Sequence, residues 1–525
     1  MIKGFRVENL RSIKDSKMIT LRKINILVGR NSSGKSTVLR FLPLLRQSVE
    51  QPTKGPILWF GRLVDFGSFE NAARDNDVSR GVRIEFNIII PKRNQGFRRA
   101  LHSSFQHFDR GDLFWAPSLN VRVSITLGRS NKDRVGNVRR LTMSIKEDRV
   151  DIIFGENGIE EIEVMSKPIK LGPGKSWGIF RGKLIPAISL LQEFHMEDDE
   201  GFTHEFTDVS LRPFASEVNA ALRKIAHGRT SEERIASIAN RLNYAPEKIF
   251  FEKLKNLAGI SADLRSRVEA LGPSSPELKS LRRYILTSKI SELIAAIDEE
   301  IAGFASSVRY VEPIRATAER YYRQQDLAVD EVDSRGENTA MFLESLSEVE
   351  MQRLKRWMKD NLGFWVVVEP GVGHIQVKIA DEKHPPRNIA DLGFGYSQIL
   401  PIVLQLWKNK SVSGVSGPQK RVLLAMEQPE LHLHPDYQAK IADLMVSCTS
   451  TQSSSLRVIL ETHSDHLINR FGSLINEGVL SHEDIQILVV DEDDEKNSEV
   501  NFAEFSEDGT LGDNWPLGFF TPEDA

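Results

Sequence analysis

A glycine-rich stretch near the N-terminus carries the residue types that bind phosphate. GRNSSGKST matches the pattern G-x-x-x-x-G-K-[ST] and stands between a predicted strand and a predicted helix. In such a loop, backbone N–H groups surround the phosphates, the lysine reaches the β- and γ-phosphates, and the next hydroxyl binds Mg²⁺. We therefore predict ATP and Mg²⁺ as cofactors, with Lys35 on the phosphates and Ser36 on the metal. The whole predicted contact set is Gly29, Arg30, Asn31, Ser32, Ser33, Gly34, Lys35, Ser36 and Thr37.

A second stretch, VLLAMEQPELHLHPD (422–436), is typical of the strand that holds the metal ion in phosphate-binding ATPases. Its apolar run leads into Glu427, which we predict to bind Mg²⁺ directly or through water. Such strands normally end in two acids, the second of which handles the attacking water, but here that position is Gln428. Because an amide cannot accept a proton, and loss of a general base costs ~10²–10⁴ in rate, we expect slow turnover.

Other interpretations of Gln428 remain open at this level. Phosphoryl transfer depends mostly on positioning and charge stabilisation, and glutamine orients the attacking water in some GTPases. Glu430 or His463 could replace the missing acid, or the glutamine could have no kinetic consequence. We predict Lys35, Glu427, Gln428 and His463 as the catalytic set.

These residues need an α/β framework to position them. INILVG (24–29) is predicted to be a buried strand, and a helix follows the glycine-rich loop. Short alternating runs between residues 81 and 170 predict an antiparallel sheet, whereas helical spacing of apolar residues extends from 184 to about 301. We predict an α/β fold: one P-loop domain made from both ends of the chain and split by a mixed β and α-helical insertion. The predicted boundaries are 1–183 for the N-terminal half, 184–305 for the helical insertion and 306–525 for the C-terminal half.

The order of the motifs along the chain adds a resemblance. Glu427 follows Lys35 by nearly 400 residues, DLGFGYSQILP (391–401) precedes Glu427, and ILETHSDHLI (459–468) follows it. This order resembles the ABC-type ATPases related to RecF, Rad50, SMC and OLD proteins. The resemblance implies that His463 is the switch histidine and that the signature contacts the γ-phosphate held by a second copy. The predicted signature contacts are Gly393, in place of the usual serine, with Gly395 and Ser397.

Because the chain has one phosphate loop and one signature, we predict a homodimer or higher oligomer with two nucleotides at its interface. The Q-loop glutamine is not identified, since no glutamine lies between Gln51 and Gln95. The stretch GPILWFGRLVDFGSFE (55–70) is predicted to occupy that region, with Asp65 taking part.

Several stretches point to one branch of these ATPases. They are GPILWFGRLVDFGSF, YVEPIRATAERYY (310–322), GEN (336–338), DLGFGYSQILP, EQPELHLHP and NWPLGFF (514–520). Together they resemble AAA/ABC-like ATPases with a DUF3696-type C-terminus and the PtuA-type ATPases of bacterial antiphage systems, Septu and certain retrons. That resemblance implies an HNH nuclease partner of the PtuB type, and in retrons also a reverse transcriptase with its DNA–RNA product.

Composition limits the classes of protein that fit. The 525 residues carry a net charge of −4 and a pI of about 6.4, so no global basic field indicates nucleic acid. One cysteine, Cys448, excludes an internal disulfide framework, and no apolar run reaches the ~18 residues of a membrane span. We therefore expect a cytoplasmic protein without a membrane partner.

Local basic clusters leave nucleic-acid contact open. They lie at 91–99 and 128–140, where solvated loops are the ordinary interpretation. The candidates for phosphate contact are Arg93, Arg98, Arg99, Arg139 and Arg140.

Two apparent metal sites are rejected. His432, His434, His463 and His466 have no nearby cysteine, and the first two follow the magnesium strand. The acidic run DEDDE (491–495) is interpreted as a hairpin turn and not as a nuclease site.

Three functions fit these observations. The favoured one is an ATPase that restrains an effector nuclease. The alternatives are a RecF-like DNA repair ATPase and a nucleotide-gated scaffold with negligible turnover.

Overall fold

The computed structural model describes residues 1–92, 114–129, 136–197, 203–210, 213–325, 328–410, 421–450, 454–493, 497–512 and 515. Three candidate nucleic-acid contacts, Arg93, Arg98 and Arg99, and all of NWPLGFF except Trp515 lie outside this part. The chain forms two compact units. The first unit comprises Met1–Arg6, Pro52–Ile57 and Asp77–Phe304, and the second comprises Val7–Gln51, Leu58–Asn76 and Ala305–Ala525.

A parallel sheet forms the centre of the second unit. Strands β21, β4, β20, β19 and β14 pair in parallel in that order. Every residue of β4 and β19 is buried, as expected for apolar strands covered on both faces. The strands in spatial order are β1 (Ile2–Leu10, of which residues 2–6 belong to the first unit), β2 (Ile13–Asp15), β22 (Ser498–Ala503), β21 (Ile485–Glu492), β4 (Ile24–Gly29), β20 (Leu456–Glu461), β19 (Val422–Glu427) and β14 (Val308–Val311), with β3 (Ile19–Thr20) paired to β1.

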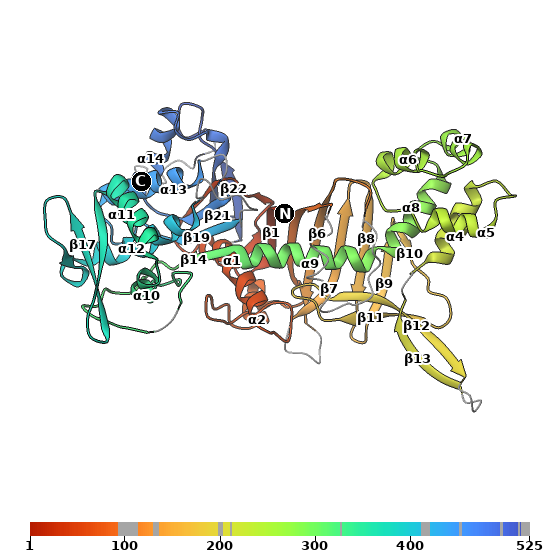
Figure 1. Ribbon diagram of the computed structural model, residues 1–525, viewed down its shortest axis with the longest axis horizontal. Coiled ribbons are helices and arrows are strands. Elements are labelled where there is room, and N and C mark those ends of the chain that lie inside the picture. Colours follow the sequence, from red (N-terminus) through yellow and green to blue (C-terminus); the bar gives the residue numbers. More distant parts are fainter. Residues whose placement is uncertain are drawn as a thin grey trace. The chain divides into compact units, whose positions relative to one another are not determined.

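Helices with clear sequence signals surround this sheet (Figure 1). Helix α1 packs across β14, β19 and β20, and α13 packs against β20. Ser347 and Glu350 form a capping box at the start of α11, Gly363 ends it in the left-handed conformation, and Pro435 occupies the first turn of α13. The helices are α1 (Lys35–Glu50), α2 (Phe69–Ala72), α10 (Thr339–Glu344), α11 (Glu348–Leu362), α12 (Phe394–Asn409), α13 (Pro435–Thr449) and α14 (Asp465–Asn476).

A small antiparallel sheet completes the second unit. It consists of β15 (Tyr322–Arg323), β17 (His374–Asp381), β16 (Phe364–Pro370) and β18 (Arg387–Asn388). Its apolar side chains, including Phe364, Val366 and Ile375, join the core formed by the parallel strands and α12.

The first unit combines an antiparallel sheet with a group of helices. Its strands are β10 (Lys167–Pro168), β9 (Ile159–Val164), β8 (Asp148–Phe154), β7 (Asn137–Ile145), β6 (Ser118–Gly128) and β5 (Val82–Pro91), in spatial order. A separate sheet contains β11 (Lys175–Phe180), β12 (Ala187–Glu197) and β13 (Thr203–Val209). The helices are α4 (Ala215–Ile225), α5 (Glu232–Ala239), α6 (Glu247–Lys255), α7 (Ala262–Leu271), α8 (Pro276–Ser288) and α9 (Ile290–Ser307, of which residues 305–307 belong to the second unit).

A buried polar cluster joins sheet and helices within the first unit. Asp148 on β8 accepts hydrogen bonds from the Tyr244 hydroxyl and from Arg282 on α8, both at 2.8 Å. Burial raises the pKa of Asp148, an effect that the charge of Arg282 opposes. Since Arg282 is itself buried, each charge depends on the other, and this pairing ties the helices to the sheet.

The predicted fold class is confirmed: an α/β domain built from both ends of the chain is split by a mixed β and helical insertion. The predicted division at residue 183 does not coincide with a boundary between the units, because β5 to β10 belong with the helices. Strands also extend to Val209, inside the segment predicted to be helical. No helix in the described part of the chain combines the length and apolar character needed to cross a membrane.

Candidate functional site

The phosphate loop connects the end of β4 to the start of α1. Gly29 and Gly34 adopt φ values of +150° and +101°, where side chains are disfavoured. A Cβ on Gly29 would lie 2.1 Å from the Val490 carbonyl oxygen, and one on Gly34 would lie 2.8 Å from the Ser12 hydroxyl. Glycine is therefore required at both positions, and the loop directs the free N–H groups of a helix N-terminus to one place.

Two side chains of the loop have donors suited to phosphate. The Lys35 ammonium donates to the carbonyl oxygens of Gly29 (3.0 Å) and Arg30 (2.6 Å), and burial lowers the pKa of Lys35. The buried Ser33 hydroxyl has no hydrogen-bond partner among the described residues. A buried polar atom without a partner is costly, so this hydroxyl fits a phosphate oxygen.

Ser36 contacts an acid that the sequence did not single out. Its hydroxyl donates to Glu461 Oε2 at 2.7 Å. Glu461 ends β20, whose register places it beside Leu27 of β4 on one side and Glu427 of β19 on the other. Burial raises the pKa of Glu461, and repulsion from Glu427 adds to that effect.

Glu427, the predicted metal ligand, is held by two side chains of the protein. Arg40, one turn after Ser36 on α1, binds both carboxylate oxygens at 2.7 Å. The Tyr310 hydroxyl donates to the same carboxylate at 2.6 Å. The hydrogen bond to Glu427 raises the pKa of Arg40, and burial raises the pKa of Tyr310. The hydroxyl of Ser36 and the carboxylates of Glu427 and Glu461 are hard oxygen donors of the kind that Mg²⁺ prefers, so this set fits the metal.

Gln428 and His463 lie around these acids. Gln428 adopts the left-handed conformation, with φ +41°, and its N–H donates to the Glu461 carbonyl oxygen at 2.8 Å. The His463 N–H donates to Glu430 at 2.8 Å. Partial burial and the charge of Lys35 lower the pKa of His463, which favours the neutral form of its ring.

A buried arginine supports the loop that carries Gln428. Arg315 Nη2 donates to the carbonyl oxygens of Pro429 (3.4 Å) and Leu431 (3.5 Å), and burial lowers the pKa of Arg315 to about 10. The backbone of Arg315 exchanges two hydrogen bonds with the side chain of Gln398 on α12. The only sequence signal for Arg315 is its place in the stretch YVEPIRATAERYY (310–322), which carries part of the family resemblance.

The predicted signature residues lie at the N-terminus of α12. Gly393, with φ +75°, precedes the helix, and Gly395 lies in its first turn. The Ser397 hydroxyl donates to the Phe394 carbonyl oxygen at 2.7 Å, so it is turned into the helix. Phe394 is 43% exposed, and its ring contacts that of His432 at 5.1 Å between centroids. The exposed residues at the start of this helix are therefore Gly393 and Phe394.

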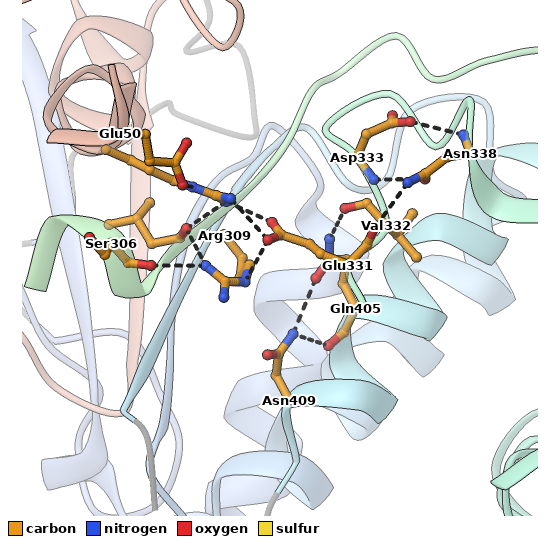
Figure 2. Close-up of polar contacts among 11 residues, drawn as sticks. Glu50, Ser306, Arg309, Glu331, Val332, Asp333, Asn338, Gln405 and Asn409 are labelled. Atoms are coloured by element: carbon orange, nitrogen blue, oxygen red, sulfur yellow. Dashed lines mark hydrogen bonds and ion pairs between the residues drawn. The ribbon is translucent and has the colours of Figure 1, made fainter. Parts of the chain in front are cut away.

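An ion-pair network links the phosphate-loop helix to the segment 331–338. Arg46 on α1 binds both oxygens of Glu331, at 2.6 and 2.9 Å, and also binds Glu50 at 2.8 Å. Arg309 binds Glu331 at 3.1 Å (Figure 2). The side chains of Arg46 and Arg309 are 8% and 14% exposed, so their charges depend on Glu331.

The same segment also contacts the signature helix. Gln405 on α12 donates to the Val332 carbonyl oxygen (Figure 2). A Cβ on Gly336 would lie 2.4 Å from Pro401 of α12, so this glycine is required for the close approach. Asn338 donates to the Glu331 carbonyl oxygen at 2.9 Å and closes the segment. The segment 331–338, which ends in the GEN stretch, thus joins the phosphate-loop helix to the signature helix.

The predicted Q-loop region packs on the other end of α1. Gln47 receives hydrogen bonds from the N–H groups of Leu63 and Val64 and donates to the Leu58 carbonyl oxygen. The Asp65 carboxylate accepts a hydrogen bond from the Gly67 N–H. The backbone carbonyl oxygen of Asp65 accepts one from the Arg11 guanidinium at 2.8 Å. Asp65 therefore shapes this loop.

Two of the predicted nucleic-acid contacts, Arg139 and Arg140, belong to the first unit. Arg140 pairs with Asp151 at 3.1 Å, and Arg139 lies over Gly128 on neighbouring strands of the first unit. Across the described ranges, no three histidine, cysteine or acidic side chains gather as a metal site.

Comparison with known proteins adds a family. The family model described as "AAA ATPase domain" matches residues 1–154 and 223–468, more than half of the chain. None of the curated proteins compared matches it.

Three solved structures are similar only weakly. An Smc head bound to the C-winged helix domain of ScpA is 10% identical, with 96% of this chain and 98% of that one covered and a TM-score of 0.33. The Smc head domain of Pyrococcus furiosus, bound to the C-terminal domain of ScpA, is 13% identical, with 96% of each chain covered and a TM-score of 0.34. The SMC head domain of Thermotoga maritima is 8% identical, with 95% and 98% covered and a TM-score of 0.33.

Glu331→Gln tests the link between the two helices. The amide keeps the size of the side chain but leaves the charges of Arg46 and Arg309 short of a partner, so we expect a loss of about 3 kcal/mol in unfolding free energy. Glu337→Gln, on the same segment but 67% exposed at its side chain, is the control and should cost almost nothing. Urea denaturation followed by tryptophan fluorescence compares the variants, and equal stability would contradict the role given to Glu331.

Proposed function

Because the chain belongs to the AAA ATPase domain family, we propose that it binds ATP with Mg²⁺ at residues 29–37, hydrolyses it slowly and dimerises around the nucleotide. The observation that carries the proposal is the meeting of the phosphate loop with two buried carboxylates, Glu427 and Glu461, at the ends of neighbouring strands. That arrangement provides donors for phosphate and acceptors for a hard cation in one place.

The chain's own residues then have distinct tasks. Loop N–H groups and the Lys35 ammonium bind the phosphates. To do so, the ammonium exchanges its present hydrogen bonds to the carbonyl oxygens of Gly29 and Arg30 for bonds to phosphate oxygens. Bound Mg²⁺ would neutralise charge on the phosphate oxygens, with Ser36 as one of its ligands. Gln428 and His463 can orient a water by hydrogen bonds, but Gln428 cannot take its proton. Slow hydrolysis and long retention of ATP follow.

Gln428→Glu tests this account of the rate. A carboxylate at that position restores a proton acceptor, so single-turnover hydrolysis of labelled ATP should accelerate on the order of 10²-fold. Lys35→Ala is the control for the site and should abolish phosphate release. If the wild-type chain hydrolyses ATP as fast as Gln428→Glu, another group accepts the proton and Gln428 does not slow the reaction.

We further propose a dimer in which α12 of one copy meets the nucleotide of the other. The support is the single phosphate loop and single signature in the chain, and the exposed glycine and Phe394 surface that begins α12. A helix N-terminus attracts anions, which suits contact with a phosphate held by a partner copy.

Light scattering with ATP and Mg²⁺ tests the dimer. The mass of the wild-type chain should double on adding the nucleotide, whereas Phe394→Asp should stay monomeric, because the added carboxylate would repel the phosphate. Val372→Asp introduces the same charge at a fully exposed position and should dimerise normally. A wild-type chain that remains monomeric at micromolar concentration would rule this proposal out.

The biological role that we propose is restraint of a partner HNH nuclease in bacterial antiphage defence. The support is the resemblance of the stretches at 55–69, 310–322, 336–338, 391–401, 427–435 and 514–520 to PtuA-type ATPases. Nucleotide state would then set whether the nuclease is held or released. Reverse transcriptase and a DNA–RNA product would join only in a retron.

Co-expression tests this role. An HNH nuclease of the PtuB type should slow bacterial growth when produced alone, and the wild-type chain should restore growth while Lys35→Ala should not. Co-purification of the two chains supplies a direct readout. Absence of any complex, together with equal growth for both versions, would dismiss the nuclease as partner.

A further inference from the structure

The second acid of the site is not at position 428, yet the structure has one beside the phosphate loop. Glu461 lies at the end of β20, is 4% exposed, and accepts a hydrogen bond from Ser36 at 2.7 Å. It reaches this place because β20 pairs with β4 on one side and β19 on the other. Its backbone is fixed as well, since its carbonyl oxygen accepts from the Gln428 N–H.

The contact with Ser36 is a hydrogen bond whose length is near the spacing of two neighbouring metal ligands. Mg²⁺ takes octahedral oxygen ligands at about 2.1 Å, which places adjacent ligand oxygens about 3.0 Å apart. The separation of 2.7 Å between Ser36 Oγ and Glu461 Oε2 is close to this value. A carboxylate at that distance can bind the cation itself or a water of its shell, with a small side-chain movement.

Glu427 is engaged differently. Arg40 binds both of its oxygens and Tyr310 donates a further hydrogen bond, so its charge is already compensated within the protein. No arginine or lysine forms an ion pair with Glu461 among those between described residues, although the charges of Lys35 and Arg40 are near enough to lower its pKa. Of the two buried acids, Glu461 is therefore the one that has no direct ion-pair partner among the described residues and can take a cation as such a partner.

We propose that Glu461 supplies the second carboxylate of the magnesium–nucleotide site, beside Ser36. The second acid of such a site normally follows the strand that here is β19, whereas Glu461 ends the neighbouring strand β20. This inference rests on the proposed function, since it names a further residue of the same site. Glu461 holds the metal and Gln428 provides no base, which together keep ATP bound with its metal while turnover stays slow.

Binding of a fluorescent ATP analogue tests the proposal, measured once with Mg²⁺ and once with EDTA. For the wild-type chain, Mg²⁺ should strengthen binding. Glu461→Gln keeps the size of the side chain and an oxygen that can accept from Ser36, so its affinity in EDTA should match the wild type. With Mg²⁺ its affinity for the analogue should fall by about tenfold or more, which is the usual effect of replacing a residue that supports a metal site.

Two further variants complete the design. Glu85→Gln removes another glutamate that is 4% exposed, in the first unit, and should leave the effect of Mg²⁺ unchanged. Glu461→Asp keeps the charge, so Mg²⁺ should strengthen nucleotide binding in this variant more than in Glu461→Gln but less than in the wild type. Binding of Mn²⁺ followed by electron paramagnetic resonance, in the presence of the nucleotide, gives a readout of metal affinity that is independent of turnover.

The outcomes separate the two proposals. An unchanged effect of Mg²⁺ in Glu461→Gln would overturn the role of Glu461 while leaving ATP binding in place. An equal loss of affinity with Mg²⁺ and with EDTA would also overturn it, since Glu461 would then only support the loop. A wild-type chain that binds no nucleotide in either condition would refute the proposed function itself.

Discussion

The pairing of β20 with both β4 and β19 is the constraint on which the site depends. Parallel strands end at the same edge of a sheet, so this order brings the phosphate loop, Glu461 and Glu427 together. The apolar sequences of β4 and β19 require cover on both faces, which α1 provides on one of them while carrying Lys35, Ser36 and Arg40. The chemistry of the site therefore follows from strand order, and a change in that order would separate the acids from the loop.

Charge pairing explains how the site can exist before nucleotide arrives. Two buried carboxylates at adjacent strand ends repel one another and are costly to hold in a low-dielectric interior. Arg40 and Tyr310 compensate Glu427, and Ser36 and the nearby Lys35 stabilise Glu461. When phosphates and a divalent cation bind, these side chains would exchange their present partners for more strongly charged ones. The network through Arg46 and Glu331 then ties the helix that makes those contacts to the signature helix.

Much of the site could be predicted because its signals are local. The glycine positions of the phosphate loop, the apolar run before Glu427 and the start of α12 are all set within a few residues, and the structure places them at the expected strand and helix ends. Glu461 could not be found this way, because its contact with Ser36 joins residues 425 apart and depends on strand order. The strands β12 and β13 were missed because their alternation lies next to strongly helical sequence. The pairing of Asp148 with Arg282 likewise spans sequence that no local pattern connects.

A structure of the chain with a non-hydrolysable ATP analogue and Mg²⁺ tests the central claim most directly. We expect phosphates within the loop 29–37, a metal about 2.1 Å from Ser36 Oγ, and the Glu461 carboxylate turned onto that metal or its waters. Nucleotide bound elsewhere, or a metal shell that excludes Glu461 altogether, would contradict it.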